Sequence, residues 1–259
     1  MKKLSVMSAL FLLGLCFSAQ AAQLNLSSWT PLTWDFPGGQ PAGNWVLSAD
    51  NLSVTQTVTA DPSAFLNNIN QTNYTMQGSW QVITGSDDDF MGFVFGYQDA
   101  SHFYLFDWKQ GNQGYVGVTA LEGFSVKKIN APNVAALGLA DFWSSSDTTY
   151  TSILATSYGS DKGYADFTEY DFYLNFQPAS FQVTVRQGLT ELWDVTVADG
   201  MYGSGQFGFY NFSQANVQYS GFEQTGGEPI PEPATMLLLG SGLVGLVAAA
   251  RRKRIFKSR

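Results

Sequence analysis

Three consecutive aspartates, Asp87, Asp88 and Asp89, stand directly before a long apolar and aromatic run of this 259-residue sequence, FMGFVFGYQDASHFYLFDW. Neighbouring carboxylates about 4 Å apart repel each other by ~1 kcal/mol in water, and by more beside a low-dielectric core. A calcium ion would offset this repulsion, because Ca²⁺ accepts about six to eight oxygen ligands from flexible loops. The pattern therefore indicates a calcium site at these aspartates. The alternative is a solvated turn before a strand, which the preceding Gly-Ser dipeptide favours.

Strand geometry limits how the three carboxylates can share one ion. On a regular strand the first and third aspartates would share a face and the second would point to the other. One ion would then take at most two of them, with further ligands from neighbouring loops. Asp61, Asp99 and Asn112 are candidate donors. The sequence contains no complete calcium loop of the D-x-[DN]-x-[DN]-G type.

Aromatic side chains are the second kind of candidate, because an exposed ring can stack on a sugar. Trp108 and Trp143 are predicted ligand-binding residues on this basis, with Tyr115 and Tyr158 as further platforms. The other interpretation of each is a core residue. Trp143 is the first of these to test, since loops carry binding more often than strands do.

Catalysis would need a pair of carboxylates. Glycosidases use two, about 5–5.5 Å apart for retention and about 6.5–9.5 Å apart for inversion. The segment TEYDFYLNF offers Glu169 and Asp171, but Tyr173 and Leu174 stand where an E-x-D-x-E or E-x-D-x-x-E array would place its second glutamate. His102 is the only histidine, and no G-x-S-x-G motif accompanies it. We therefore expect no enzymatic activity; the alternative is a glycoside hydrolase acting on exopolysaccharide.

Short strands are expected to position these residues. FQVTVRQ (181–187) alternates apolar with polar residues, which is typical of a strand with one buried face. HFYLFDWKQ (102–110) is apolar on both faces, as in a central strand. WDVTV, GQFGFYNF and VQYSGF are similar, and Gly, Asn, Asp and Ser separate the runs. The body, residues 22–226, is predicted to be one all-β domain, an antiparallel β-sandwich.

The N-terminal residues 1–21 read as a secretory signal peptide. Lys2 and Lys3 precede an apolar run that ends in the small-x-small site Ala19-Gln20-Ala21. Cys16, the only cysteine, lies inside this segment. The mature protein is therefore expected to have neither disulfides nor thiolate metal sites.

The C-terminal end divides into three parts: a linker at 227–233, an apolar segment at 234–250 and a basic tail at 251–259. Seventeen apolar residues reach about 25 Å as a helix, close to the bilayer core of about 30 Å. We expect a single transmembrane helix that holds the protein in the inner membrane, with its basic tail in the cytoplasm.

Charge excludes one class of partner. Between the two ends, residues 22–230 carry 5 basic and 20 acidic residues, a net charge of −15. Such a surface repels nucleic acid and anionic lipid and attracts divalent cations.

The tripeptide Pro231-Glu232-Pro233, the apolar segment and the basic cluster that begins with Arg251 and Arg252 resemble the PEP-CTERM sorting signal. This resemblance implies recognition by an exosortase, cleavage near the tripeptide, and a location at the cell surface or in the extracellular matrix of a Gram-negative bacterium. Membrane anchoring would then be transient.

The blocks DDDFMGFVFGYQ, HFYLFDWKQ, GYADFTEYDFYLNF and GSGQFGFYNFSQANVQYSGFE resemble the thrombospondin C-terminal domain. The likeness runs from Trp45 to Glu223 and is poor between Ile129 and Gly163. It implies a concanavalin A-like lectin sandwich, or jelly roll, that binds extracellular polysaccharide or matrix protein, with a role in cell adhesion or the biofilm matrix. The family's richness in calcium also favours a calcium cofactor.

Overall fold

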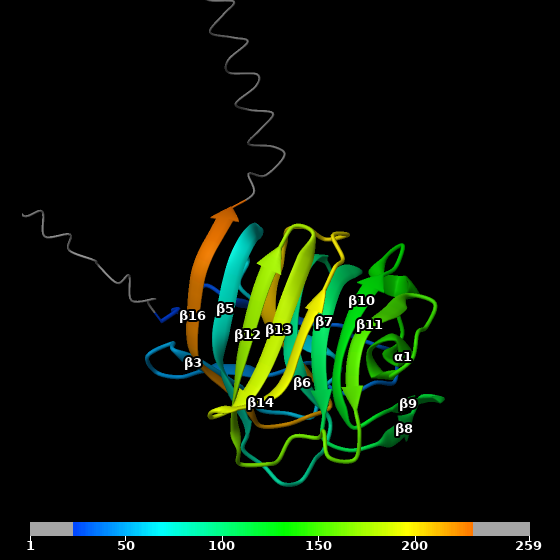
Figure 1. Cartoon of the computed structure of the whole chain (residues 1–259). Coiled ribbons are helices and arrows are strands. Elements are labelled where there is room, and N and C mark those ends of the chain that lie inside the picture. The colour runs from blue at the N-terminus through cyan, green and yellow to red at the C-terminus, as the bar shows by residue number, and fades with distance from the viewer. Residues whose placement is uncertain (1–22, 230–259) are drawn as a thin grey trace, which may run out of the picture.

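The computed structural model describes residues 23–229, which form two seven-stranded antiparallel sheets packed face to face (Figure 1). Sheet A contains β2 (Trp45–Leu47), β3 (Ser53–Gln56), β5 (Gln71–Val82), β12 (Glu169–Gln177), β13 (Ser180–Gln187), β14 (Thr190–Val197) and β16 (Val217–Pro229). Sheet B contains β1 (Thr30–Thr33), β4 (Ser63–Leu66), β6 (Phe90–Asp99), β7 (His102–Lys109), β10 (Gly123–Asn130), β11 (Thr151–Tyr158) and β15 (Gln206–Phe212). A hairpin of β8 (Gln113–Tyr115) and β9 (Val118–Ala120), a 3₁₀ helix η1 (Val134–Ala136) and a short helix α1 (Leu139–Trp143) complete the described elements.

The strand order in sheet A is β14-β13-β12-β5-β16-β3-β2, and in sheet B it is β1-β4-β15-β6-β7-β10-β11. Most neighbours in these orders are distant in sequence, as in β16 beside β5 or β15 beside β6. The prediction of an all-β, lectin-like antiparallel sandwich is confirmed.

Strand β7 is buried on both faces, as its sequence predicts. Tyr104, Phe106 and Trp108 face the core between the two sheets, whereas Phe103 and Leu105 face a second core on the outer side of sheet B. Strand β7 lies between β6 and β10, so its backbone hydrogen bonds are satisfied on both edges. Strand β13 likewise follows its predicted alternation, with its apolar residues in the core between the sheets.

The core between the sheets consists largely of aromatic rings. Trp80 of β5 stacks on Phe172 of β12 with 4.8 Å between ring centroids. Phe93 and Phe106 stack across β6 and β7 at 4.7 Å. Ring pairs in such arrangements contribute about 0.5–1.5 kcal/mol each beyond the area they bury. Large rings therefore fill the space between the sheets. Their packing holds sheet A in place, and with it the strands that form its outer face.

Residues 131–150, between β10 and β11, cover part of the outer face of sheet B and contribute to the second core. Trp34, Phe103 and Phe142 pack there with centroid distances of 5.1 and 5.2 Å from the Trp34 ring to the other two. Helix α1, drawn beside β10 and β11 in Figure 1, supplies Phe142 and Trp143. Of the segment 129–163, whose structure the sequence left open, the part before β11 covers sheet B, and β11 is an edge strand of that sheet.

A buried ion pair ties this cover to sheet B. Lys127 of β10 places its Nζ 2.7 Å from Oδ2 of Asp107 on β7, and both side chains are almost wholly buried. The same Nζ donates a 2.7 Å hydrogen bond to the carbonyl of Phe142 in α1. Burial raises the pKa of Asp107, although the ammonium of Lys127 and the hydroxyl of Ser125 act to lower it. Removing either partner would leave the other charge buried without compensation, which destabilises the folded protein.

The N-terminal end of the described chain lies beside strand β16. Gln23 forms an isolated antiparallel bridge with Glu223 of β16, the strand that runs to Pro229. The predicted signal peptide, the Pro231-Glu232-Pro233 tripeptide, the apolar segment and the basic tail lie outside the described residues. Within residues 23–229, no helix is long and apolar enough to cross a membrane.

Candidate functional site

The three consecutive aspartates lie in the loop that leads into β6, not on a strand. One carboxylate oxygen from each of Asp87, Asp88 and Asp89 lies within 4.8 Å of the others. The alternation of a regular strand, which would send the second carboxylate to the opposite face, therefore does not apply here, because these residues are not part of a ladder. The three carboxylates therefore form one cluster, whose mutual repulsion a cation would offset.

A buried lysine already lies at this cluster. Lys109, at the end of β7, pairs in register with Phe90, so its side chain lies beside the loop. Its Nζ is 2.7 Å from Oδ1 of Asp89, 3.2 Å from Oδ1 of Asp88 and 2.9 Å from the Asp88 carbonyl. Lys109 was missed in the sequence analysis. Its signal is a lysine at the end of a strand that is apolar on both faces, where a buried ammonium needs an anionic partner.

Asp87 is the aspartate without an ammonium partner. Partial burial and, after it, repulsion by the carboxylate of Asp89 together raise the pKa of Asp87 from 3.8 to about 6. Asp87 is therefore the carboxylate that an added cation would stabilise most. The carboxylates of Asp88 and Asp89 would have to contact both that cation and the ammonium of Lys109.

The loop residues suggested as further calcium ligands are engaged elsewhere. Asp61 accepts hydrogen bonds from the backbone N–H groups of Phe36 and Gln40 at 3.0 and 2.8 Å. The amide oxygen of Asn112 accepts one from the backbone of Glu122 at 2.7 Å. These contacts hold loops in shape, so the aspartate loop would bind an ion mainly with its own oxygens and with water.

The two tryptophans predicted as sugar platforms are buried, and the structure does not support that role. Trp108 lies in the core between the sheets, stacked on Phe124 at 4.4 Å. Trp143 lies under the cover of sheet B, edge-on to Phe90 at 5.3 Å and to Tyr115 at 5.0 Å. Each is 1% exposed, so neither ring offers a face to a ligand. The physical reason is that burying the large apolar area of an indole ring stabilises the folded protein.

The single histidine belongs to a turn between β6 and β7. Nδ1 of His102 lies 2.9 Å from Oδ1 of Asp99, and the hydroxyl of Ser101 donates to the same carboxylate oxygen at 2.8 Å. In a hydrolase triad the serine and the aspartate occupy opposite nitrogens of the imidazole. Here the serine hydroxyl and the imidazole both contact the carboxylate of Asp99. This arrangement stabilises a turn and does not form a triad.

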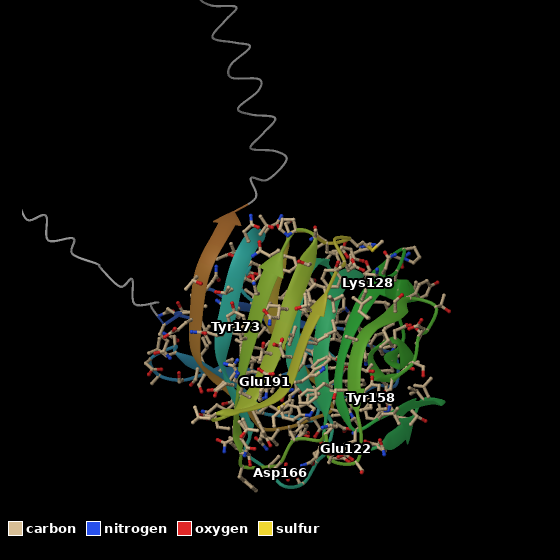
Figure 2. The ribbon with its side chains drawn as sticks, in the orientation of Figure 1. Glu122, Lys128, Tyr158, Asp166, Tyr173 and Glu191 are labelled. Atoms are coloured by element: carbon tan, nitrogen blue, oxygen red, sulfur yellow. The ribbon has the colours of Figure 1, made fainter. Side chains whose placement is uncertain are left out.

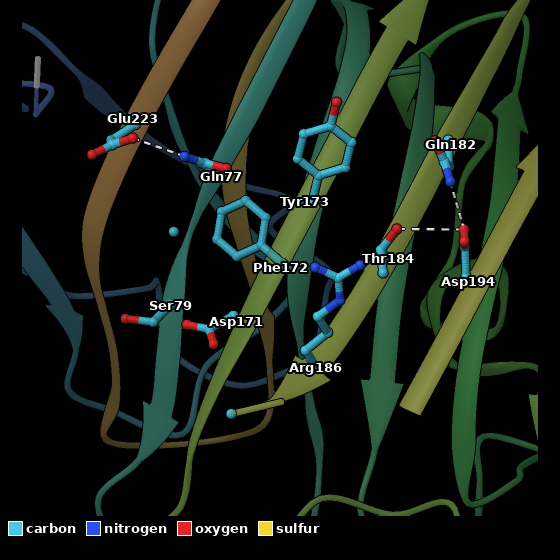
Figure 3. Close-up of a pocket in the computed structure, with 12 residues that line it drawn as sticks. Gln77, Ser79, Asp171, Phe172, Tyr173, Gln182, Thr184, Arg186, Asp194 and Glu223 are labelled. Atoms are coloured by element: carbon cyan, nitrogen blue, oxygen red, sulfur yellow. Dashed lines mark hydrogen bonds between the residues drawn. The ribbon is translucent and has the colours of Figure 1, made fainter. Parts of the chain in front are cut away.

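An open groove crosses the outer face of sheet A and is the candidate functional site (Figure 3). It has a volume of about 670 Å³. Figure 2 places Tyr173 and Glu191 on this face of the front sheet. The lining residues are Gln77, Gly78, Ser79, Asp171, Phe172, Tyr173, Gln182, Thr184, Arg186, Gly188, Asp194 and Glu223.

Register places five of these residues in one row across five strands. Glu223 of β16 pairs with Gln77 of β5, which pairs with Tyr173 of β12. Tyr173 pairs with Thr184 of β13, which pairs with Asp194 of β14. Neighbouring strands lie about 4.8 Å apart, so the row is ~19 Å long, with a carboxylate at each end and a phenol ring in the middle.

Hydrogen bonds orient the two terminal carboxylates. Nε2 of Gln77 donates to Oε2 of Glu223 at 2.8 Å. Nε2 of Gln182 donates to Oδ1 of Asp194 at 2.8 Å, and the hydroxyl of Thr184 does so at 3.4 Å (Figure 3). The donors are neutral, so the charges of both carboxylates remain available to a ligand.

Asp171 lies two residues before Tyr173 on the same face of β12. It pairs in register with Arg186, but the guanidinium Nη2 lies 3.5 Å from Oε2 of Glu191. Among residues 23–229, the side-chain carboxylate of Asp171 makes no hydrogen bond or ion pair. Glu169, its proposed catalytic partner, lies on the same face and is exposed, but it does not line the groove.

The fold and this groove define a class: a lectin-like β-sandwich with an open polar face. Comparison with known proteins identifies the family within that class. The chain belongs to the thrombospondin C-terminal region family, whose model matches residues 40–226.

Two curated relatives illustrate the match. Thrombospondin-4-B of Danio rerio is 31% identical over 199 residues, which cover 73% of this chain and 21% of that protein. Cartilage oligomeric matrix protein of Rattus norvegicus is 29% identical over 198 residues, which cover 73% of this chain and 26% of that protein. The chain thus spans between a fifth and about a quarter of the length of these relatives.

Among solved structures, carbohydrate-binding module CBM66 of Bacillus subtilis has a similar fold, with a TM-score of 0.50 and 13% sequence identity. The similarity covers 78% of this chain and 98% of the module. At this identity the likeness supports the fold alone.

The C-terminal sorting signal is confirmed by a second family match. The PEP-CTERM protein-sorting motif matches residues 229–253, which include Pro231, Glu232, Pro233, Arg251 and Arg252. The protein is therefore exported and is processed by an exosortase to reach the surface of a Gram-negative bacterium.

Proposed function

We propose that this protein is a non-enzymatic surface or matrix protein that binds extracellular glycan through the groove on sheet A. The observation that carries the proposal is the row from Glu223 to Asp194, in which fixed carboxylates and amides flank the ring of Tyr173. Sugars are recognised by polar groups in fixed positions together with an aromatic face. A role in adhesion or in the biofilm matrix accords with export to the cell surface.

The groove is favoured over a protein-binding surface because its lining is polar and hollowed. All of its residues except Gly188 come from five neighbouring strands, and so the sheet holds their positions. A matrix protein as the ligand remains the other outcome of the same binding experiment.

The experiment is a glycan array probed with the full-length protein purified in mild detergent. Reproducible binding that Tyr173→Ala removes is the expected result. The control variant is Asp161→Asn, which changes an exposed aspartate outside the groove. Absence of binding to any glycan, or binding that survives Tyr173→Ala undiminished, would count against the proposal.

A glycoside hydrolase is the second candidate, because Asp171 is an unpaired carboxylate in the groove. It would need Glu169 as its acid or base, at about 5–5.5 or 6.5–9.5 Å. Release of reducing ends from exopolysaccharide, abolished by changing both residues to alanine, would establish this activity. We favour glycan binding over hydrolysis because Glu169 lies outside the groove.

We propose that a calcium ion binds at Asp87, Asp88 and Asp89 and stabilises the loop before β6. Clustering of the three carboxylates supports it, and the ammonium of Lys109 competes with it. When bound, the ion would neutralise the repulsion around Asp87. A melting temperature that rises with calcium and not with magnesium is the expected result, and a melting temperature unchanged by calcium would contradict it.

A further inference from the structure

The lining of the groove carries an unbalanced charge. Asp171, Asp194 and Glu223 contribute three carboxylates, and Arg186 contributes the one cationic group of the lining residues. Nη2 of Arg186 lies 3.5 Å from Oε2 of Glu191, which is outside the lining, and Arg186 makes no ion pair with Asp171. The groove therefore presents a net negative surface to whatever enters it.

The carboxylates are held in place without losing their charge. Asp194 and Glu223 accept hydrogen bonds only from neutral amide and hydroxyl donors. The side-chain carboxylate of Asp171 has no partner among residues 23–229. The remainder of the protein adds to this field, since residues 22–230 carry a net charge of −15.

This arrangement discriminates among classes of glycan. A polymer that carries uronate, sulfate or phosphate groups would bring like charges together in the groove, and like charges in contact oppose binding. A neutral sugar would gain only hydrogen bonds and stacking. A protonated amino group would add charge-assisted hydrogen bonds to carboxylates that are already oriented.

We propose that the groove selects glycans bearing free, protonated amino groups, such as hexosamine polymers that have lost their N-acetyl groups. This inference rests on the proposed function of the groove as a glycan site. The sugar chain lies across the strands, with one ring on Tyr173 and amino groups at Glu223 and Asp194. Asp171, below the centre of the row, receives a third amino group.

The test is isothermal titration calorimetry at pH 6 with the full-length protein in mild detergent. The probes are a glucosamine oligomer, the N-acetylglucosamine oligomer of equal length, and a polyuronate oligomer. We expect the glucosamine oligomer to bind at least tenfold more tightly than the acetylated one, and its affinity to fall with added salt. Exposed charge pairs are each worth a factor of roughly two to five. The double variant Asp194→Asn, Glu223→Gln should therefore weaken the glucosamine oligomer about tenfold and leave the acetylated oligomer nearly unchanged.

Asp161→Asn is the control, since it removes an exposed carboxylate elsewhere on the surface. If this control weakens binding as much as the groove variants do, the oligomer binds as a polycation anywhere on the acidic surface and the inference is wrong. If the acetylated or polyuronate oligomer binds as tightly as the glucosamine oligomer, and Tyr173→Ala abolishes that binding, the groove is a glycan site and only the charge selection fails. If none of the three probes binds, the amine selection fails, and the glycan array decides whether the proposed function fails with it.

Discussion

Replacing Asp87 by asparagine should stabilise the protein at neutral pH. The side chain keeps its size and loses its charge, and so both the cost of burying that charge and the repulsion by Asp89 disappear while the loop retains its shape. Asp88 and Asp89 form ion pairs with Lys109, whereas Asp87 has no ammonium partner within residues 23–229. Removing a carboxylate from this cluster therefore removes an unfavourable interaction.

The size of the effect follows from the pKa. In the folded protein the pKa of Asp87 is about 6, against an ordinary value of 3.8. Each pKa unit corresponds to about 1.4 kcal/mol, so the full shift is worth about 3 kcal/mol. Asp87 is only partly buried, and solvent screening reduces this to roughly 1.5 kcal/mol. A chain of this size should then gain about 3–6 °C in melting temperature.

The sign of the pH dependence is fixed by the direction of the shift. Because folding raises the pKa of Asp87, ionisation of this carboxyl costs stability in the folded state. The cost is absent below pH 3.8, grows between pH 3.8 and 6, and is complete above pH 6. Asp87→Asn should therefore stabilise at pH 7 and have no effect at pH 3.5.

The assay is thermal unfolding of wild type and variant at both pH values in EDTA, repeated at pH 7 with calcium. Asp88→Asn is the control, since it removes a partner of Lys109 and should lower the melting temperature. With calcium present the wild type should gain stability that Asp87→Asn lacks. A lower melting temperature for Asp87→Asn in EDTA at pH 7 would refute the electrostatic argument.

Three further predictions concern the two cores. Lys127→Met leaves the carboxylate of Asp107 buried without its ion-pair partner and should cost about 3–5 kcal/mol, measured by urea unfolding; a loss below 1 kcal/mol would show that the pair is hydrated. Trp143→Ala should cost about 3–5 kcal/mol by the same measurement but leave glycan affinity unchanged, because the ring is buried away from the groove; a selective loss of binding would restore its predicted ligand role. Gly92→Ala should abolish folding or lower the melting temperature strongly, since a Cβ there would lie 2.0 Å from the carbonyl oxygen of Phe106; circular dichroism of a well-folded variant would contradict the close approach of β6 and β7.

The local patterns of the chain were sufficient for the fold class. Alternation in FQVTVRQ and the doubly apolar HFYLFDWKQ predict a half-buried strand and a central strand, and β13 and β7 have these positions. Side-chain alternation is a property of any extended strand, so it can be read without knowing which strand lies beside it. The sorting signal is likewise local, because composition and order within one continuous segment define it.

Pairing between distant segments was beyond these patterns. The groove is a row of residues at 223, 77, 173, 184 and 194, brought together by the register of five strands. No spacing along the chain reveals such a row, because a slip of one residue in any strand would turn its side chain to the other face.

By itself, the sequence determined an exported, acidic β-sandwich with a C-terminal sorting signal, since hydropathy, charge and strand period are properties of continuous segments. Tertiary structure alone decided which polar groups meet. It brought Lys109 to the three aspartates, buried Trp108 and Trp143, and left the carboxylate of Asp171 without a partner in the groove. The physical reason is that the energy of a charge or a ring depends on its surroundings, and those surroundings come from segments far away in the chain.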